Sequence, residues 1–584
     1  MRRKKLPIYC ADFETTSLKQ YELENETRVY LWCLKSVDES YSGYGVDMDS
    51  FFETLYSLNE EKIICYFHNL SFDGEFINWW LVGKGYRYKE NVLDKIEDNT
   101  FSPIIDEVGS IYSIRVIYKG MYIEFRCSYK LFPKSIEDIG EMVGVKKLKE
   151  IHDYESIKNY VDLIDVPDDE IMYINNDVLI MCRLIKYLDS VGINAITMSS
   201  SAYKNWRMDK YQLCKHQFIK DENDEINEIV RKSYRGGITK VNPKYAGQLL
   251  HGVISFDVNS LYPSVMYENK IPIGMGKIYK TIYECRKDRR YAYIVEVLVK
   301  YAKVKNGYHA FIGEDSGFTY SRKYNYSDEL LNKTLYLWDT EFRLFNKIYD
   351  NDSVILKVVG YKTANNVFTE YIDRWYSVKE NAKTPAERQL AKLMLNSLYG
   401  KFGMNDARAS KIPVEIREDE IIYRIIETFS CYYDKKVASF ITSKARVKYA
   451  TFMNLCFDKF VYGDTDSIYY LSDKIPDIFK DIVDDKKMGF WKYEGYYPRF
   501  KALKAKCYIK EVNGKINVKV SGCPKECASK INFDNFQIGL KLEDCKKVKR
   551  KVKGGIVIDT TDFTIGVWEE YILQVMRHFI KIII

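Results

Sequence analysis

The sequence lacks any run of roughly 18 apolar residues, so it offers no candidate for a membrane-spanning helix. It also lacks an apolar segment behind the basic N-terminal residues, and we therefore expect no secretory signal peptide. Internal repeats and low-complexity tracts are absent. The excess of basic over acidic residues is only 7, and 46% of residues are hydrophobic. This balance excludes a disordered or collagen-like chain and makes any basic surface a local feature.

The length and the aromatic content are the next two indications. At about 150 residues per domain, 584 residues predict roughly four compact units. Aromatic residues make up 15% of the chain, and 50 of them are Tyr. A tyrosine ring has an apolar face and a polar tip, which suits stacking on bases or sugars. An AT-rich genome would enrich Tyr without a structural reason, so composition leaves both explanations open.

The 13 cysteines are scattered and odd in number, which indicates a reducing, cytoplasmic compartment. Cys523, Cys527 and Cys545 form the cluster to test as a metal site. Their spacing matches no zinc motif, so we expect ordinary thiols.

Hydrophobic patterning divides the chain. From Leu6 to about Leu188, short apolar runs alternate with polar turns and then pass into helical spacing at 173–187, which predicts a first α/β domain. The charged stretch 220–237 ends in Gly-Gly and predicts a domain junction. Two strand-like runs and one helical run follow, at 252–256, 459–463 and 386–399.

The end of the chain carries a basic run and a helical pattern. The basic run contains Lys546, Lys547, Lys549, Arg550, Lys551 and Lys553. It is either a phosphate-contacting strip or a solvated charged face. After Gly566, apolar residues recur at helical period, which predicts an amphipathic helix at 567–584 packed on the body of the protein.

A first set of carboxylates lies in the N-terminal region. Asp12 and Glu14 are two residues apart in a strand-like run and therefore project from one face. Asp73 follows in "HNLSFDGEF", and Asp177 lies one helical turn after Tyr173. Adjacent like charges repel unless a cation joins them. The set therefore predicts a site for two divalent cations that hydrolyses phosphodiesters, although each piece alone is common on protein surfaces.

A second set lies downstream. Asp257 ends the apolar run "HGVISFD", and Asp464 and Asp466 lie in "VYGDTDSIYY", at strand spacing near a hairpin tip. Their apolar flanks disfavour a solvated acidic hairpin. The arrangement predicts two Mg²⁺ ions that bridge a nucleoside triphosphate and a primer hydroxyl.

The helical run between these acidic motifs carries a polar stripe. Arg388, Lys392, Asn396 and Tyr399 recur at intervals of four, four and three residues. The cations suit a triphosphate, while Asn396 and Tyr399 suit a sugar and base.

Taken in order, these motifs resemble the family B DNA polymerases, specifically the protein-primed branch of small tailed bacteriophages. The resemblance runs from Cys10 to about Ile565 and rests on eight ordered motifs. They are DFETT, HNLSFDGEF, Tyr173-x-x-x-Asp177, YRGG, DVNSLYPS, KLMLNSLYG, YGDTDS and Lys506-x-Tyr508.

The resemblance implies an α/β multidomain fold. An RNase H-like 3′→5′ exonuclease domain would precede a right-hand palm, fingers and thumb polymerase with two insertions. The implied exonuclease covers 1–190, and the first part of the palm covers 191–266, with a linker at 234–237. Insertion 1 (267–366), the fingers (367–403) and insertion 2 (404–436) would follow. The second part of the palm would cover 437–525, the thumb 526–566 and an additional helical tail 567–584.

Site roles follow by resemblance. In the exonuclease, the metal ligands would be Asp12, Glu14, Asp73 and Asp177, with Tyr173 orienting water, Lys149 assisting at the phosphate, and Asn69, Phe72, Ser128 and Tyr129 binding the single strand. In the polymerase, Asp257, the Val258 backbone and Asp466 would hold metal, with Asp464 in support. Tyr262, Lys379, Lys392, Asn396 and Tyr399 would bind dNTP, with Arg388 where Lys is usual. Tyr234, Gly236 and Gly237 would bind template, and Lys506 and Tyr508 the primer end.

The resemblance also implies partners. These are two Mg²⁺ ions per active site, with Mn²⁺ as a substitute, DNA template and primer, dNTPs, and a terminal protein as primer. A single-stranded DNA-binding protein is a further candidate partner. We expect a monomer in the cytoplasm of an infected bacterium. Two alternatives stay open, a conventionally primed family B polymerase and a nucleic-acid-binding replication accessory without catalysis. A pure binder has no use for carboxylates where phosphates lie, which disfavours the accessory.

Overall fold

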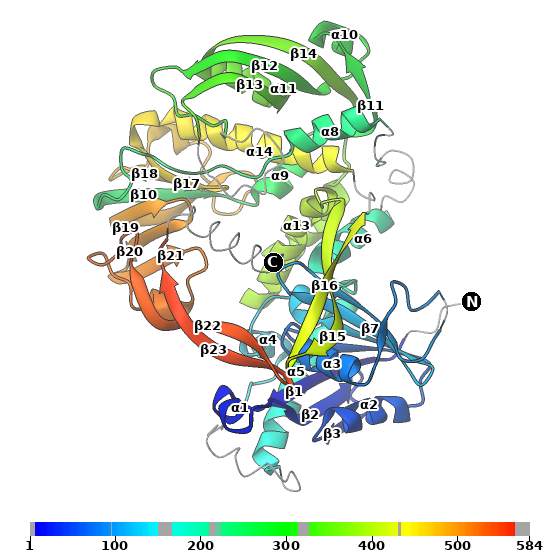
Figure 1. The fold of residues 1–584 in the computed structure, drawn as a ribbon. Helices are drawn as coiled ribbons and strands as arrows, with labels where there is room; N and C mark the ends of the chain where they lie inside the picture. Colours follow the sequence, from blue (N-terminus) through cyan, green and yellow to red (C-terminus); the bar gives the residue numbers. More distant parts are fainter. Residues whose placement is uncertain are drawn as a thin grey trace.

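The structure is a computed structural model that describes residues 6–94, 96–149, 166–209, 218, 221, 223–313, 326–429 and 434–566 (Figure 1). The amphipathic helix expected at 567–584 lies outside these residues. Within them, no helix is both long enough and apolar enough to cross a membrane.

The N-terminal unit is built on an eight-stranded sheet in the order β3-β2-β1-β4-β8-β7-β6-β5. One face packs against α5 through Cys10 and Met181, and the other buries Phe13 and Phe76 in a separate core. Both faces of the sheet are therefore covered, as in an α/β unit. Its elements are β1 (Ile8–Thr15), α1 (Leu18–Glu24), β2 (Val29–Ser36), β3 (Ser42–Gly45), α2 (Met48–Ser57), β4 (Lys62–Phe67), α3 (Asp73–Gly83), β5 (Arg87–Tyr88), β6 (Thr100–Ile105), β7 (Ile111–Tyr118), β8 (Met121–Cys127), α4 (Ile136–Val143) and α5 (Asp168–Ser190).

A seven-stranded sheet forms the centre of the rest of the chain, in the order β21-β20-β19-β10-β18-β17-β9. Its strands β10, β17 and β18 contain the apolar runs that flank the second carboxylate set, and these runs are buried. The strands are β9 (Thr239–Val241), β10 (Leu250–Val258), β17 (Phe460–Asp464), β18 (Ser467–Leu471), β19 (Trp491–Lys504), β20 (Cys507–Val512) and β21 (Lys515–Val520).

Helices cover this central sheet. The predicted polar-striped helix is α13 (Pro385–Phe402), which begins where the Thr384 hydroxyl accepts a hydrogen bond from the Glu387 N–H, and which has Pro in its first turn. Its apolar side, including Leu390, Met394 and Leu398, is buried. The other helices are α6 (Met198–Asp209), α8 (Asp224–Ser233), α9 (Leu261–Glu268), α12 (Thr369–Glu380) and α14 (Lys435–Leu455).

The charged stretch 220–237, where the sequence predicts a domain junction, contains regular structure. Much of it is helix α8, whose Ile226, Ile229 and Val230 are buried. These residues recur at helical spacing, and the dense charges on the opposite side obscured that pattern.

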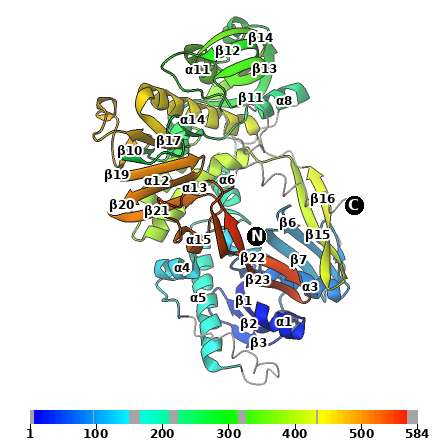
Figure 2. The same ribbon diagram turned by 60° about the vertical axis from the view of Figure 1, so that its left-hand side comes forward.

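Three further β elements extend from the body (Figures 1 and 2). A four-stranded sheet lies at the top in Figure 1, in the order β11-β14-β12-β13. Two long hairpins, β15–β16 and β22–β23, reach toward the N-terminal unit, as Figure 2 shows. The elements are β11 (Ile271–Tyr279), α10 (Ile282–Lys287), β12 (Ala292–Val304), β13 (Glu329–Trp338), α11 (Asp339–Ile348), β14 (Tyr349–Ala364), β15 (Ala407–Arg417), β16 (Glu420–Phe429), α15 (Lys525–Ala528), β22 (Lys541–Val552) and β23 (Gly555–Thr564).

Two cysteines correct the expectation of ordinary thiols. Cys527 and Cys545 form a disulfide, with Cα atoms 5.3 Å apart, that joins α15 to β22. Cys523 remains a half-buried free thiol. The pairing depends on how α15 packs against the hairpin, which the spacing of cysteines in the sequence does not reveal.

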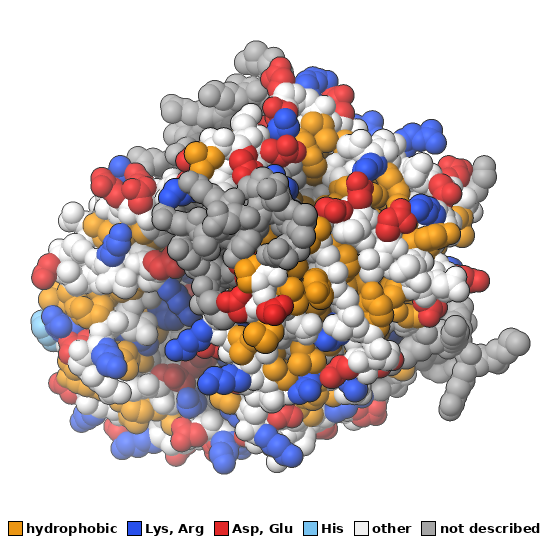
Figure 3. Space-filling model, turned by 90° about the horizontal axis from the view of Figure 1, so that it is seen from below, with side chains coloured by type: hydrophobic (Ala, Val, Ile, Leu, Met, Phe, Trp, Pro, Cys, Tyr) orange, Lys and Arg blue, Asp and Glu red, His pale blue; other side chains and the backbone are white. Residues whose placement is uncertain are grey.

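The surface seen from the end of the N-terminal unit is electrostatically mixed. Basic, acidic and hydrophobic side chains are interspersed there (Figure 3). This view agrees with the small excess of basic residues, which makes any basic surface local.

Candidate active sites

The structure brings the first carboxylate set together around β1, an interior strand of the N-terminal sheet. Asp12 and Glu14 lie on β1, Asp73 begins α3, and Asp177 is buried in the middle of α5. Burial raises the pKa of Asp12 well above its ordinary value, and the charges of Asp73, Glu14 and Asp177 raise it further. Burial also raises the pKa of Asp73 to about 7. The four groups therefore repel one another when ionised.

Lys147 contacts this set, although the sequence did not identify it as a site residue. Its Nζ lies 3.0 Å from Asp177 Oδ2 and 5.1 Å from the ring centroid of Tyr173. Burial lowers the pKa of Lys147, but the charges of Asp177 and Tyr173 and the hydrogen bonds to both residues together outweigh burial and raise that pKa. Lys149, selected by resemblance, is exposed. Sequence spacing could not rank the lysines of "KKLK", because the chain here is not a regular helix or strand.

The four residues expected to bind a single strand lie beside the carboxylates, in different environments. The Ser128 hydroxyl is buried, donates to the Phe67 carbonyl at 3.1 Å and lies 2.9 Å from His68 Nδ1. The Tyr129 ring is 42% exposed and packs edge-on against His68. Tyr129 is therefore open to stack on a base, whereas Ser128 fixes His68. Asn69 has a left-handed backbone, with φ 69°, and Phe72 is half-buried.

The second carboxylate set lies where β10 meets the β17–β18 hairpin. The Val258 N–H donates to the Asp466 carbonyl at 2.9 Å, and Asp257 pairs with Ser467 across the sheet. Burial raises the pKa of Asp257 to about 7, and the charge of Asp466 contributes. Two repelling carboxylates are thus held side by side by backbone pairing.

Asp464 has a different role from its neighbours. Both of its carboxylate oxygens lie 2.8 Å from Lys506 Nζ, and Oδ1 also accepts from Thr239 Oγ1 at 2.9 Å. A carboxylate already neutralised by an ammonium suits support of the hairpin turn and orientation of Lys506 better than metal binding. Tyr508 packs near it, with its hydroxyl 3.3 Å from Tyr469 Oη.

The YRGG segment is attached to the same hairpin turn. The Thr465 N–H donates to the Ile238 carbonyl at 2.7 Å. A Cβ on Gly237 would lie 2.8 Å from Thr465 Cγ2, so the close approach requires glycine. Arg446 donates to the Gly236 carbonyl at 3.1 Å. The residues expected to bind template therefore contact the same hairpin turn that carries Asp464 and Asp466.

The expected nucleotide-binding residues converge between α9, α12 and α13. Tyr262 stacks on Tyr399 with ring centroids 4.1 Å apart. Lys379 Nζ donates to Ser260 Oγ at 3.3 Å, and Arg388 donates to the Lys379 carbonyl at 3.1 Å. Burial lowers the pKa of Lys379, and the charges of Arg388 and Lys392 act in the same direction. Lys392 is exposed and Asn396 half-buried on the same stripe. Converging cations of this kind attract a polyanion.

Both carboxylate sets fit divalent cations by their chemistry. Among the described residues, no group of three carboxylate, imidazole or thiol side chains converges into a ready-made metal cage. Mg²⁺ is commonly held by one or two carboxylates together with water and substrate phosphates. Burial, together with repulsion by Asp466, raises the pKa of Asp257, and a bound cation would offset both effects by stabilising the charged carboxylates.

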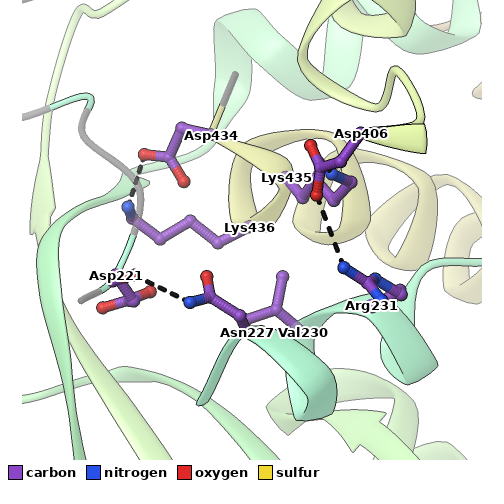
Figure 4. Close-up of a pocket in the computed structure, with 8 residues that line it drawn as sticks. All are labelled: Asp221, Asn227, Val230, Arg231, Asp406, Asp434, Lys435 and Lys436. Carbon is purple, nitrogen blue, oxygen red and sulfur yellow. Dashed lines mark hydrogen bonds and ion pairs between the residues drawn. The ribbon is translucent and has the colours of Figure 1, made fainter. Parts of the chain in front are cut away.

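A pocket elsewhere in the protein has a structural explanation. It is small, with a cavity volume of about 10 Å³, and lies where both ends of the β15–β16 hairpin meet α8 (Figure 4). Asp406 pairs with Lys435 at 2.5 Å and with Arg231 at 3.4 Å, while Lys436 pairs with Asp434. These ion pairs anchor the hairpin. The lining residues are Asp221, Asn227, Val230, Arg231, Asp406, Asp434, Lys435 and Lys436.

Comparisons with known proteins agree with this architecture. Residues 145–484 match the family model of DNA polymerase type B, organellar and viral. The chain is 30% identical to the DNA polymerase of Bacillus phage M2, covering 96% of this chain and 99% of the relative. It is likewise 30% identical to the DNA polymerases of Bacillus phage phi29, covering 97% and 100%, and Streptococcus phage Cp-1, covering 95% and 98%.

Solved structures show the same similarity. The phi29 DNA polymerase complexed with primer-template DNA and incoming nucleotide substrates superposes with a TM-score of 0.86 at 29% identity, covering 96% of this chain and 100% of that one. The phi29 DNA polymerase complexed with single-stranded DNA superposes with a TM-score of 0.82 at 28% identity and the same coverage.

Proposed function

The chain belongs to the type B DNA polymerases of viruses and organelles and is a DNA polymerase, and we propose that it replicates a linear phage genome by protein-primed initiation, with strand displacement and 3′→5′ proofreading. Its fold is the expected one, an exonuclease unit followed by palm, fingers and thumb. The synthesis and proofreading parts of the proposal are carried by the presence of two separate carboxylate sets, each beside residues suited to a nucleic acid.

At the polymerase site, Asp257 and Asp466 would hold Mg²⁺, with the Val258 backbone alongside. When bound, the cations lower the pKa of the primer hydroxyl and stabilise charge on the triphosphate. The chain itself orients the reactants. Lys379 and Lys392 attract the triphosphate, and Tyr262, stacked on Tyr399, presents a flat wall where a sugar would lie. Lys506, held by Asp464, offers an ammonium to the primer end.

At the exonuclease site, Asp12, Glu14, Asp73 and Asp177 would hold the cations that activate water for phosphodiester hydrolysis. Tyr173, one helical turn before Asp177, lies under the Lys147 ammonium and can orient that water through its hydroxyl. The exposed Tyr129 ring can stack on a frayed base.

The domain limits extend the proposal. We assign the exonuclease to 1–190, the palm to 191–266 and 437–525, the fingers to 367–403 and the thumb to 526–566. Insertion 1 (267–366) would contain the four-stranded sheet and receive a terminal protein, and insertion 2 (404–436) would contain the β15–β16 hairpin and support processivity. Each proposed insertion contains an element that projects from the body (Figure 2). We place the enzyme in the cytoplasm of an infected bacterium, as a monomer.

Asp466→Asn tests the separation of the two sites. The variant should lose primer extension, because the remaining carboxylate cannot hold the cations, while degradation of single-stranded DNA continues at the wild-type rate. Both activities are measured with one labelled oligonucleotide, with and without a template and dNTPs. Loss of both activities in a variant with wild-type thermal stability would contradict the separation.

A further inference from the structure

Three segments that are far apart in the chain meet at one buried carboxylate, Glu75, on helix α3. Lys551 Nζ of β22 lies 3.0 Å from Glu75 Oε1 and 3.2 Å from Oε2. The Tyr423 hydroxyl of β16 donates to Oε2 at 2.5 Å. Lys551 Nζ also lies 3.6 Å from the Tyr423 ring centroid. We call these three residues the clasp.

The backbone of the β22–β23 hairpin is seated in the N-terminal unit beside the clasp. The Thr27 N–H donates to the Lys553 carbonyl at 3.0 Å. Gly554 has φ 90°, and a Cβ there would lie 1.8 Å from the Thr27 carbonyl oxygen. Ile556 is 2% exposed and belongs to the core that packs against α3. The end of this hairpin, residues 551–556, is therefore an integral part of the N-terminal unit, as Figure 2 shows; we call it the thumb tip.

Glu75 is buried and lies close to Asp73 in the chain, so its contacts with the clasp bear on the first carboxylate set. The Glu75 side chain is 4% exposed, and both of its oxygens are engaged by the clasp. A buried carboxylate that loses its ammonium partner is strongly unfavourable, and this cost destabilises the turn of α3 that keeps Glu75 buried. Glu75 lies in the first turn of α3, two residues after Asp73. A shift of this turn that brings Glu75 to water therefore also moves Asp73.

A second lysine of the β22–β23 hairpin, Lys549, also lies near the start of α3. Lys549 Nζ lies 5.8 Å from the ring centroid of Phe72, the residue before Asp73. Lys549 and Lys551 are two apart on one strand and share a face. The sequence left this basic run open between a phosphate strip and a solvated surface. The structure places at least these two of its cations beside the first turn of α3, which carries Asp73.

We propose that the thumb tip is a positioning part of the proofreading site, in which Lys551 and Tyr423 hold Glu75 and thereby fix the α3 turn that presents Asp73. The inference rests on the proposed exonuclease function. Lys551 is a positioning residue, since it acts through Glu75. The same contact links the exonuclease to the thumb and to the β15–β16 hairpin, so a movement of either element changes the geometry of proofreading.

Lys551→Met is the decisive variant, because it keeps most of the side-chain stem and removes the charge. Loss of a group bonded directly to a metal ligand commonly lowers activity or metal affinity by about 10- to 100-fold. Lys551 acts on Asp73 one step further away, through Glu75, so its loss should fall at the lower end of that range. We expect the kcat for degradation of a labelled single-stranded oligonucleotide to fall by about tenfold or more, and the half-saturating Mg²⁺ concentration to rise. Single-nucleotide incorporation should keep its Mg²⁺ dependence. Lys551→Arg should restore most of the activity.

The control is Lys541→Met on the same strand, where Lys541 forms an exposed pair with Asp562 at 2.7 Å. This variant should degrade DNA as the wild type does. Wild-type kcat and Mg²⁺ dependence in Lys551→Met would overturn the proposal. A change in KM alone would also overturn it, because it would make Lys551 a DNA contact.

Amide hydrogen exchange separates this inference from the proposed function. The amides of α3 should exchange faster in Lys551→Met than in the wild type, whether or not the protein degrades DNA. Unchanged exchange along α3 would refute the clasp. A wild-type protein without Mg²⁺-dependent degradation would refute the exonuclease proposal itself and, with it, the positioning role in proofreading.

Discussion

Replacing Glu341 by Gln removes the carboxylate that neutralises two buried guanidinium groups. They belong to Arg235, in the YRGG segment, and to Arg446. Glu341 lies 3.0 Å from Arg235 and 2.9 Å from Arg446, and its side chain is 1% exposed. It also accepts from the Ser443 hydroxyl at 3.0 Å. Removing one partner of a buried ion pair costs about 3–5 kcal/mol, because the opposite charge remains buried. For a domain of about 150–250 residues, each kcal/mol lowers the melting temperature by about 2–4 °C. The melting temperature of the variant should therefore fall by about 6–20 °C.

Differential scanning calorimetry of the purified variant measures this loss. Glu329→Gln is the matched control, since the pair between Glu329 and Lys303 has a similar distance of 2.7 Å but side chains 51% and 59% exposed. Exposed pairs contribute about 0–1 kcal/mol, so the control should melt within about 4 °C of the wild type. Because Arg446 also donates to the Gly236 carbonyl, Glu341→Gln should in addition weaken primer–template binding. A Glu341→Gln variant that melts with the control would refute the reasoning.

Three further predictions concern the active sites. Asp12→Ala combined with Asp73→Ala should abolish Mg²⁺-dependent degradation and leave primer extension intact; persistent digestion would count against the assignment. Lys147→Met should reduce degradation by about tenfold, because Lys147 contacts Asp177. Lys149→Met should have a smaller effect. The reverse ranking in the same assay would favour Lys149 as the lysine that assists at the phosphate. The pKa of Asp257 is raised to about 7 by burial and by Asp466, so below that pH a proton competes with the cation. The half-saturating Mg²⁺ concentration for synthesis should then rise by up to about tenfold per pH unit below 7 and level off above it, and a flat profile between pH 6 and 8 would contradict this.

Local patterns predicted the parts of the sites that lie on regular elements. Asp12 and Glu14 share a face because side chains alternate along β1. The α13 stripe follows from helical spacing, with Leu390 and Met394 buried opposite Lys392. The family prediction is confirmed by the comparisons. Protein priming, the domain limits and the residue roles remain predictions.

The parts that the sequence did not predict depend on contacts between distant segments. Lys147 is set apart from Lys149 by contact with α5. The clasp joins residues 75, 423 and 551, and no local period relates such positions. The disulfide between Cys527 and Cys545 likewise depends on how a short helix packs on a hairpin. In each case the chemistry follows from tertiary packing, which spacing in the sequence does not encode.

The most direct test of the central claim is synthesis by the purified protein alone on a singly primed single-stranded DNA circle, with dNTPs and Mg²⁺, and products sized on a denaturing gel. A polymerase of the proposed type, with a working second insertion, should give products many times the length of the circle, because it displaces the strand ahead of it without helpers. Products that end at one circle length would contradict unaided strand displacement and favour a conventionally primed enzyme. No product at all would contradict the polymerase site itself.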